Sequence, residues 1–315
     1  MKDSRAVALQ MCPFSDYFEA GLRERFEIVR WFELEKTAQP AWLKQHAPRV
    51  RAIVTSGHIG CSNELVEALP ALGVVAINGV GVDKVDLQLA RSREVRVTTT
   101  PGTLTEDVAD LAVGLTISLL RSIPAADAYA RSGHWARGDF PLGRKVSGRR
   151  FGIVGLGAIG FAIASRLSVF GPVAYTGPHR KPAPYAFVAD LVELANASDV
   201  LVLACPATAA TRHIVNARVL EALGPSSYLV NIARGAVVDE SALIAALQTG
   251  ALAGAALDVF DNEPHVPEAL RAIPRVVLTP HIASATVETR THMANIVLAN
   301  LDAFLAGQAL PTAVV

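Results

Sequence analysis

The chain has no excess of either charge, because its 315 residues include 29 Lys and Arg and 29 Asp and Glu. Surfaces that bind nucleic acid or membranes need a basic excess, so the composition predicts neither kind of partner. Long apolar runs are also absent. The opening MKDSRAVALQMC is too short an apolar run for a signal peptide, and residues 111–120 reach only about half the length of a membrane span. These absences predict a cytoplasmic protein.

Cysteine and aromatic residues are scarce. The three cysteines, Cys12, Cys61 and Cys205, are odd in number and far apart, which predicts free thiols in a reducing compartment and no metal site. Aromatic residues make up 6% of the chain, although 51% of it is hydrophobic. We therefore expect an aliphatic core, which suits parallel sheets that are buried on both faces.

A length of 315 residues predicts two domains. Short apolar segments alternate with helical patterns, which is typical of α/β domains with doubly wound parallel sheets. We expect one domain from residues 1–98 and 284–315, and a second from residues 99–283 with six strands, a complete Rossmann count. Strands are predicted at 6–9, 51–55, 74–78, 95–98, 152–154, 173–176, 200–204, 228–232, 254–257 and 276–278. Helices are predicted at 16–25, 41–46, 62–69, 85–93, 103–121, 159–170, 191–196, 217–223, 240–248 and 284–305.

The helix predicted at 103–121 is the most distinct in the sequence. Thr103 and Glu106 form a capping-box pattern, and apolar residues then occupy most faces of the helix. Such a helix is expected to be buried between two domains or two subunits. A polar loop containing Trp135 follows it, and an exposed tryptophan there would suit either a subunit interface or simple packing.

Residues 151–181 have the order strand, tight turn, helix, strand of a dinucleotide-binding unit. The turn contains G-x-G-x-x-G at Gly155, Gly157 and Gly160. The first glycine allows the sharp turn, the second leaves room for a pyrophosphate, and the third lets the helix lie close to its strand. The helix start then offers N–H groups and a positive dipole end to the phosphates.

No acidic residue occurs between Gly160 and Asp190. Units that bind NAD usually carry Asp or Glu about 20 residues after the glycines, to hold the ribose 2′-hydroxyl. Here Arg180 and Lys181 lie near the end of the second strand, where they could bind a 2′-phosphate, and Thr176 could donate a hydrogen bond to it. Alone, these would be read as solvated loop residues. With the acid missing, they favour NADP over NAD.

Three polar side chains follow late strands of the second domain, namely Arg234, Glu263 and His281. Individually they could be a surface cation, a loop carboxylate and a structural histidine. Together they suit carbonyl reduction. A cation can hold a carboxylate and polarise a carbonyl, a protonated histidine can deliver a proton, and a carboxylate can orient that histidine. In the first domain, the glycine-spaced residues 78–82 could bind a small anion, although their spacing favours an ordinary turn.

The chain resembles the D-isomer-specific 2-hydroxyacid dehydrogenases over nearly its whole length. The matching segments are NGVGVDKVD (78–86), LTEDVADLAVGL (104–115), GIVGLGAIG (152–160), NIARGAVVDESAL (231–243), DVFDNEP (258–264) and TPHIASAT (279–286). The resemblance implies two doubly wound parallel-sheet domains, one a flavodoxin-like substrate domain and the other a Rossmann cofactor domain. It also implies a homodimer built through the segment after residue 101.

The resemblance also implies roles for individual residues. Arg234 would bind the substrate carboxylate and carbonyl, His281 would be the acid/base, and Glu263 would be its carboxylate partner. Asp258 would meet the nicotinamide carboxamide. The implied cofactor contacts are Gly155, Gly157, Ala158, Ile159, Thr176, Arg180, Lys181, Cys205, Pro206, Thr211, Ile232 and Asp258. The implied substrate contacts are Ser56, Val80, Gly81, Arg234 and Trp135, with Val80 and Gly81 acting through backbone amides, and Met11, Phe14 and His58 are further pocket candidates.

Within the family, the chain is most similar to NADPH-dependent glyoxylate/hydroxypyruvate reductases and plant-type hydroxyphenylpyruvate reductases. The loop after Thr176 and the segment LACPATAATRHIV (203–215) carry this similarity. In that branch, the tryptophan corresponding to Trp135 is inserted towards the active site of the neighbouring subunit. The chain departs from the branch at residues 176–179, where a second Ser or Arg is common.

These features predict an enzyme that reduces a small 2-oxoacid to the D-2-hydroxyacid. The substrate would be glyoxylate, hydroxypyruvate or an aryl pyruvate, with hydride from NADPH and a proton from His281. The alternative is a nucleotide-sensing regulatory or scaffold protein on the same fold. Two other dehydrogenase classes are excluded. None of the tyrosines is followed by Lys four positions later, as a short-chain dehydrogenase requires, and zinc alcohol dehydrogenases need more cysteine ligands.

Overall fold

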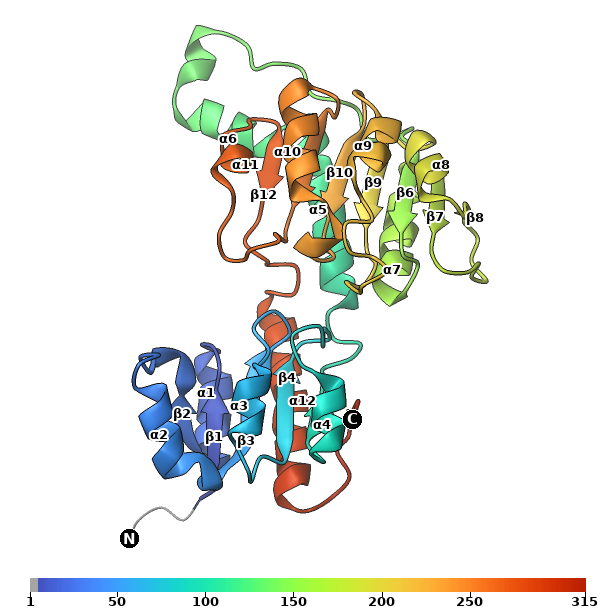
Figure 1. The fold of residues 1–315 in the computed structure, drawn as a ribbon. Coiled ribbons are helices and arrows are strands. Elements are labelled where there is room, and N and C mark those ends of the chain that lie inside the picture. Colours follow the sequence, from blue (N-terminus) through green and yellow to red (C-terminus); the bar gives the residue numbers. More distant parts are fainter. Residues whose placement is uncertain (1–4) are drawn as a thin grey trace. The chain divides into compact units, whose positions relative to one another are not determined.

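The computed structural model describes residues 5–315 and contains two compact units, each with its own sheet (Figure 1). Unit 1 comprises residues 5–103 together with Thr286–Val315, and unit 2 comprises Leu104–Ala285. Both sheets are parallel, with helices beside them, so the fold class predicted from the sequence is confirmed.

Unit 1 has a five-stranded sheet in the order β2-β1-β3-β4-β5, which is the flavodoxin-like order 2-1-3-4-5. Its strands are β1 (Val7–Gln10), β2 (Glu27–Arg30), β3 (Val50–Ser56), β4 (Val74–Asn78) and β5 (Arg96–Thr98). Its helices are α1 (Asp16–Arg25), α2 (Gln39–His46), α3 (Asn63–Glu67), α4 (Leu87–Ser92) and α12 (Val287–Leu305), with short 3₁₀ helices at Trp31–Glu33 and Ala47–Arg49. Strand β2 was not predicted, because this edge strand is only half-buried and has a charged residue at each end.

Helix α12 covers one face of the unit 1 sheet (Figure 1). Thr286 caps its start, accepting a hydrogen bond from the Thr289 amide at 3.1 Å. Ala294, Val297 and Leu301 are at most 1% exposed and pack with apolar side chains of β1, β3, β4 and α1. This contact buries a continuous apolar stripe of the helix, which is the main way that helices are stabilised in proteins.

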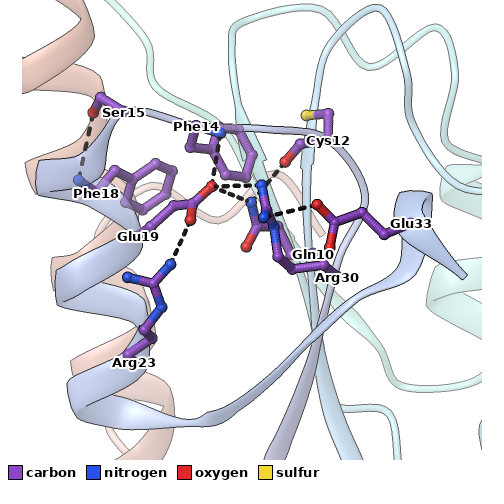
Figure 2. Close-up of polar contacts among 9 residues, drawn as sticks. All are labelled: Gln10, Cys12, Phe14, Ser15, Phe18, Glu19, Arg23, Arg30 and Glu33. Atoms are coloured by element: carbon purple, nitrogen blue, oxygen red, sulfur yellow. Dashed lines mark hydrogen bonds and ion pairs between the residues drawn. The ribbon is translucent and has the colours of Figure 1, made fainter.

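A buried carboxylate connects α1 to β1 and β2 (Figure 2). The side chain of Glu19 is 8% exposed, and Gln10 Nε2 and Arg23 Nη2 donate to it at 2.9 and 2.6 Å. The Phe14 amide donates at 3.3 Å, and Arg30 Nη2 lies at 3.6 Å. Burial acts to raise the pKa of Glu19, but these hydrogen bonds and the two guanidinium charges outweigh it and lower the pKa.

We expect Glu19→Gln to destabilise the protein by about 1–3 kcal/mol, because an amide NH₂ would face donors that now meet a carboxylate oxygen. A group whose pKa is lowered by folding contributes stability above its unfolded pKa, and this contribution is lost as the pH falls through the folded pKa. The variant should therefore lose less stability than the wild type on acidification below the ordinary value of 4.5. Urea unfolding at neutral and acid pH measures both effects.

Glu24→Gln is the matched control for this prediction, because Glu24 lies on the same helix and its side chain is 76% exposed. Its unfolding free energy should stay within about 0.5 kcal/mol of the wild type, as is usual for surface substitutions. Equal losses of stability for Glu24→Gln and Glu19→Gln would show that the buried network adds nothing specific.

Unit 2 has a seven-stranded sheet in the order β12-β11-β10-β9-β6-β7-β8. Counted from β6, this is the Rossmann order 3-2-1-4-5-6 with one further strand at the β12 edge. The strands are β6 (Phe151–Val154), β7 (Val173–Thr176), β8 (Ala186–Phe187), β9 (Val200–Leu203), β10 (Tyr228–Asn231), β11 (Gly254–Leu257) and β12 (Val276–Leu278). Six of these strands are predicted by the sequence, and the two-residue β8 is not.

Most of the unit 2 helices lie along this sheet, whereas α6 extends away from it (Figure 1). They are α5 (Thr105–Arg121), α6 (Ile123–Arg131), α7 (Ala158–Leu167), α8 (Leu191–Asn196), α9 (Ala217–Leu223), α10 (Glu240–Thr249) and α11 (Glu268–Arg271), with 3₁₀ helices at His134–Arg137 and Gly235–Val237. Helices α6 and α11 were not predicted from the sequence. Helix α6 follows α5 after one left-handed residue, Ser122, and none of its residues is buried.

The start of α5 differs from the prediction. The residue preceding the helix is Leu104, and no side chain caps the first turn. The hydroxyl of Thr103 instead donates to the Thr100 carbonyl at 2.9 Å, so the predicted capping box with Glu106 is wrong. One face of α5, including Ala112 and Leu115, is buried in the core of unit 2.

Within residues 5–315, no single helix is long and apolar enough to cross a membrane, and only the bent pair α5–α6 passes that test jointly.

Candidate active site

The three predicted catalytic residues lie at one edge of the unit 2 sheet. Arg234, Glu263 and His281 follow β10, β11 and β12, which are neighbours in the sheet. Because the strands are parallel, their carboxyl ends meet at the same edge. Ligands of doubly wound sheets bind outside these ends. The topology therefore gathers a cation, a carboxylate and an imidazole where a ligand is expected.

His281 and Glu263 are in direct contact. Nδ1 of His281 lies 2.7 Å from Oε2 of Glu263, and the two side chains are 26% and 22% exposed. The other carboxylate oxygen of Glu263 accepts a hydrogen bond from the Phe260 amide at 3.1 Å. The carboxylate is thereby fixed at both oxygens, and the imidazole is oriented with Nε2 on the side away from Glu263. This is the arrangement of a general acid held by a carboxylate.

Asp258 holds the turn that carries His281. It is fully buried at the end of β11, and its carboxylate accepts from the Thr279 hydroxyl at 2.6 Å and from the amides of Ile282 and Ala283 at 2.9 and 3.0 Å. Burial raises the pKa of Asp258 against these hydrogen bonds. The Asp258 carbonyl also accepts from the His281 amide at 2.9 Å. The family resemblance implied a nicotinamide contact for Asp258. This structural role was not predicted, because it depends on a turn 21 residues away along the chain.

The turn that carries Arg234 is shaped by Asn231, which the sequence analysis did not single out. Asn231 is 1% exposed, and its side chain donates to the Arg234 carbonyl and accepts from the Ala233 amide, both at 3.0 Å. A methyl group at Gly235 would collide with the backbone of Phe260. The turn therefore packs against the loop that leads to Glu263. The only signal in the sequence was a polar residue at the end of an apolar strand.

The glycine loop fits a dinucleotide phosphate. Gly155 has a positive φ of 94°, and a Cβ there would lie 2.8 Å from Cys205 Cα. At Gly160, a Cβ would collide with the Gly155 carbonyl, so helix and turn are in close contact. At Gly157, in contrast, a Cβ would meet nothing within 4 Å. No side chain caps α7, so the amides of its first turn, which begins at Ala158, face an open space that suits phosphate oxygens.

Arg180 and Lys181 are exposed on the loop between β7 and β8. Thr176 is buried at the end of β7, and its hydroxyl donates to the Ala189 carbonyl at 3.2 Å. That hydroxyl proton is therefore already used within the fold, which weakens the case for Thr176 as a donor to a phosphate. The first acid after the loop, Asp190, caps α8 with its side chain.

The remaining predicted cofactor residues lie at the carboxyl ends of neighbouring strands. Cys205 and Ile232 follow β9 and β10 and are 8% and 6% exposed, and burial raises the pKa of the Cys205 thiol to about 11. Thr211 donates to the Pro206 carbonyl at 2.6 Å, so it stabilises its own loop. Ile159 lies in the first turn of α7. All three cysteines are free, and residues 5–315 contain no group of three side chains that could hold a metal ion.

Two loops of unit 1 carry the other substrate candidates. Ser56 is the last residue of β3 and is 4% exposed. Its Oγ lies 3.2 Å from Nδ1 of His58. Val80 and Gly81 follow β4, which is next to β3 in the sheet. A Cβ at Gly57 would lie 3.0 Å from the Gly81 carbonyl, so the two loops are in contact. Unit 1 thus brings these three candidates together at one sheet edge.

Two further pocket candidates, Met11 and Phe14, lie on the loop after β1. Gln10 Nε2, which binds Glu19, also donates to the Cys12 carbonyl at 2.8 Å and so holds this loop (Figure 2). Trp135 is in a 3₁₀ helix of unit 2 and is 70% exposed. The predicted polar loop around Trp135 is therefore partly helical, with the tryptophan on its surface.

Known proteins resemble this chain over nearly its full length. A sequence model of the D-isomer specific 2-hydroxyacid dehydrogenase NAD-binding domain matches residues 113–283. The hydroxyphenylpyruvate reductase of Plectranthus scutellarioides and glyoxylate/hydroxypyruvate reductase A of Arabidopsis thaliana are each 48% identical, with 98% of both chains covered. The NADPH-dependent glyoxylate/hydroxypyruvate reductase of Sinorhizobium meliloti, solved with NADP and malonate, has a TM-score of 0.89 at 42% identity, covering 98% of this chain and 97% of that one. The chain belongs to the D-isomer-specific 2-hydroxyacid dehydrogenase family.

Proposed function

We propose that the protein reduces a small 2-oxoacid to the D-2-hydroxyacid with NADPH. The observation that carries the proposal is the His281–Glu263 contact of 2.7 Å at the sheet edge that Arg234 shares. A sensor or scaffold protein on this fold would not need a general acid such as His281, oriented by Glu263, at the same end of the sheet as Arg234. The names of the relatives, all reductases of 2-oxoacids, support the same reaction.

In this reaction, bound NADPH supplies the hydride. Arg234 binds the carboxylate of the 2-oxoacid and polarises its carbonyl through charge-assisted hydrogen bonds. His281 delivers the proton from Nε2, because Nδ1 faces Glu263. Glu263 keeps the imidazole in this orientation while the substrate binds. The amides of Val80 and Gly81 hold the substrate carboxylate.

The cofactor preference is assigned to the loop after β7. Arg180 and Lys181 present two exposed cations, and no acid precedes Asp190 to repel a 2′-phosphate. The NADP in the Sinorhizobium meliloti structure supports this assignment by similarity. Fluorescence titration should give tighter binding of NADPH than of NADH. Equal or tighter binding of NADH would overturn the assignment.

The substrate is proposed to be glyoxylate, hydroxypyruvate or hydroxyphenylpyruvate, the oxoacids in the names of the relatives. The decisive test is turnover of each compound with NADPH and with NADH, followed by the absorbance of the reduced nicotinamide. At least one oxoacid should be reduced with NADPH. Binding of NADPH without turnover on the whole panel would favour a sensor or scaffold instead.

The two units are assigned different tasks. We assign residues 1–98 and 284–315 to a substrate domain and residues 99–283 to an NADP-binding domain. The glycine loop, Asp258 and the Arg180–Lys181 pair all belong to unit 2, which supports its assignment to the cofactor. Ser56 and the loop after β4 support the assignment of unit 1. Free cysteines and the absence of a basic excess support a location in the cytoplasm.

We further propose a homodimer that buries the segment after residue 101. Leu142 is 100% exposed, Trp135 is 70% exposed and Ile123 is 46% exposed, which is unusual for large apolar side chains so close together in sequence. In this dimer, Trp135 reaches the neighbouring subunit's active site. Sedimentation equilibrium should give twice the chain mass of 33.3 kDa, whereas a monomer at micromolar concentration would contradict the proposal.

A further inference from the structure

The hydroxyl of Tyr175 reaches the loop that carries the two cations. Tyr175 lies in β7 and is 1% exposed, and its ring packs on Phe187 of β8 with centroids 5.3 Å apart. Its hydroxyl accepts a hydrogen bond from the Lys181 amide at 2.6 Å and lies 3.2 Å from the Lys181 carbonyl, to which it donates. One buried side chain therefore fixes both backbone polar groups of a loop residue.

Apart from Ala183, which packs against the unit 2 core, few contacts hold this loop between its ends. Within residues 5–315, no hydrogen bond other than the two from Tyr175 reaches residues 178–184. Near the far end of the loop, the ring of Tyr185 packs on Phe161 of α7, with the ring centroids 5.8 Å apart. Three prolines in the segment restrict φ but supply no amide donor. The Tyr175 hydroxyl thus makes the only hydrogen bonds to the loop midpoint among residues 5–315.

The midpoint is also where the loop carries its charge. Arg180 and Lys181 are adjacent and exposed, and neither makes an ion pair within the described part of the chain. Thr176, just before the loop, donates its hydroxyl hydrogen bond to a backbone carbonyl, and Asp190, the first acid after the loop, caps the start of α8. Recognition of a phosphate by this loop therefore relies on the two cations, whose backbone Tyr175 holds.

We propose that Tyr175 is a positioning residue that sets the selectivity for NADPH over NADH. The proposal rests on the proposed function of the Arg180–Lys181 pair as the 2′-phosphate site. A loop that is already ordered loses less conformational entropy when the phosphate binds, so the hydroxyl should strengthen binding without touching the cofactor. NADH lacks this phosphate, and its affinity should not depend on the loop midpoint.

The test is Tyr175→Phe in the full chain, which keeps the ring and removes the hydroxyl. Calorimetric titration without substrate should show NADPH binding weakened about three- to tenfold, because the variant removes both hydrogen bonds that preorganise the loop. The affinity for NADH should change by less than about twofold. Amide hydrogen exchange should become faster in residues 177–185. Tyr228→Phe is the matched control, because Tyr228 is 8% exposed on β10 and its hydroxyl makes no hydrogen bond within the described residues.

The double variant Arg180→Ala/Lys181→Ala separates this inference from the cofactor assignment. It should lose the preference for NADPH, and adding Tyr175→Phe should then weaken NADPH binding no further. If the double variant loses the preference but Tyr175→Phe alone changes neither NADPH affinity nor exchange, the role of Tyr175 is overturned and the cofactor assignment stands. Equal weakening of NADPH and NADH by Tyr175→Phe also overturns it. An unchanged preference in the double variant overturns the phosphate site itself.

Discussion

His281→Ala should lower kcat by about 10²–10⁴-fold, the usual contribution of a positioned general acid. The imidazole is the group that Glu263 orients at 2.7 Å, and the alanine side chain has no proton to deliver. Binding of NADPH should be nearly unchanged. His281 follows β12, the outer strand on one side of the sheet, whereas the Arg180–Lys181 loop joins β7 to β8 on the other side. Steady-state kinetics and cofactor titration of the same preparation measure both quantities.

The backbone at this position requires a second variant. His281 has a positive φ of 53°, a conformation that asparagine tolerates better than alanine. His281→Asn should therefore show the same loss of kcat with less loss of stability. His292→Ala, an exposed histidine on α12, is the control and should keep full activity. Unchanged kcat in both His281 variants would remove this residue from the mechanism.

Arg234→Ala should lower kcat/KM by about 10²–10³-fold, comparable to the loss of one donor from an oxyanion site. Both parameters should change, because the guanidinium is assigned to the substrate carboxylate in the ground state and to the carbonyl oxygen in the transition state. Arg234→Lys should recover only part of the loss, since an ammonium group cannot make the planar two-pronged contact. Initial rates over a range of oxoacid concentrations separate kcat from KM.

The control for Arg234 is Arg218→Ala, which removes an exposed arginine from α9 in the same unit. It should leave both parameters unchanged. A rise in KM with kcat intact for Arg234→Ala would mean that Arg234 only binds the substrate and gives no additional stabilisation to the transition state. That result would assign carbonyl polarisation to another group.

Much of the fold could be predicted from the sequence, because buried parallel strands are short apolar runs with distinct ends. Strand β6, expected at 152–154, spans Phe151–Val154, and β7 spans the predicted residues 173–176. Strand β2 escaped prediction because an edge strand needs no continuous apolar pattern. The capping box failed because the Thr103 hydroxyl bonds the Thr100 carbonyl, a competing local contact that the sequence pattern does not exclude.

The sequence could identify which residues form the candidate site, but not which of them contact one another. Glu263 and His281 are 18 residues apart, and their approach depends on β11 and β12 being neighbours in the sheet. The strand order is set by packing of the whole unit, which no local pattern encodes. The role of Tyr175 was missed for the same reason. A tyrosine in a strand reads as core, and only the path of the following loop brings Lys181 to its hydroxyl.

The most direct test of the proposed function is chiral analysis of the product formed from hydroxypyruvate and NADPH. Hydride transfer to C2 with a proton from His281 should give D-glycerate in an amount equal to the NADPH consumed, and His281→Ala should form almost none. L-glycerate as the product, or no turnover of any 2-oxoacid by a protein that binds NADPH, would contradict the account.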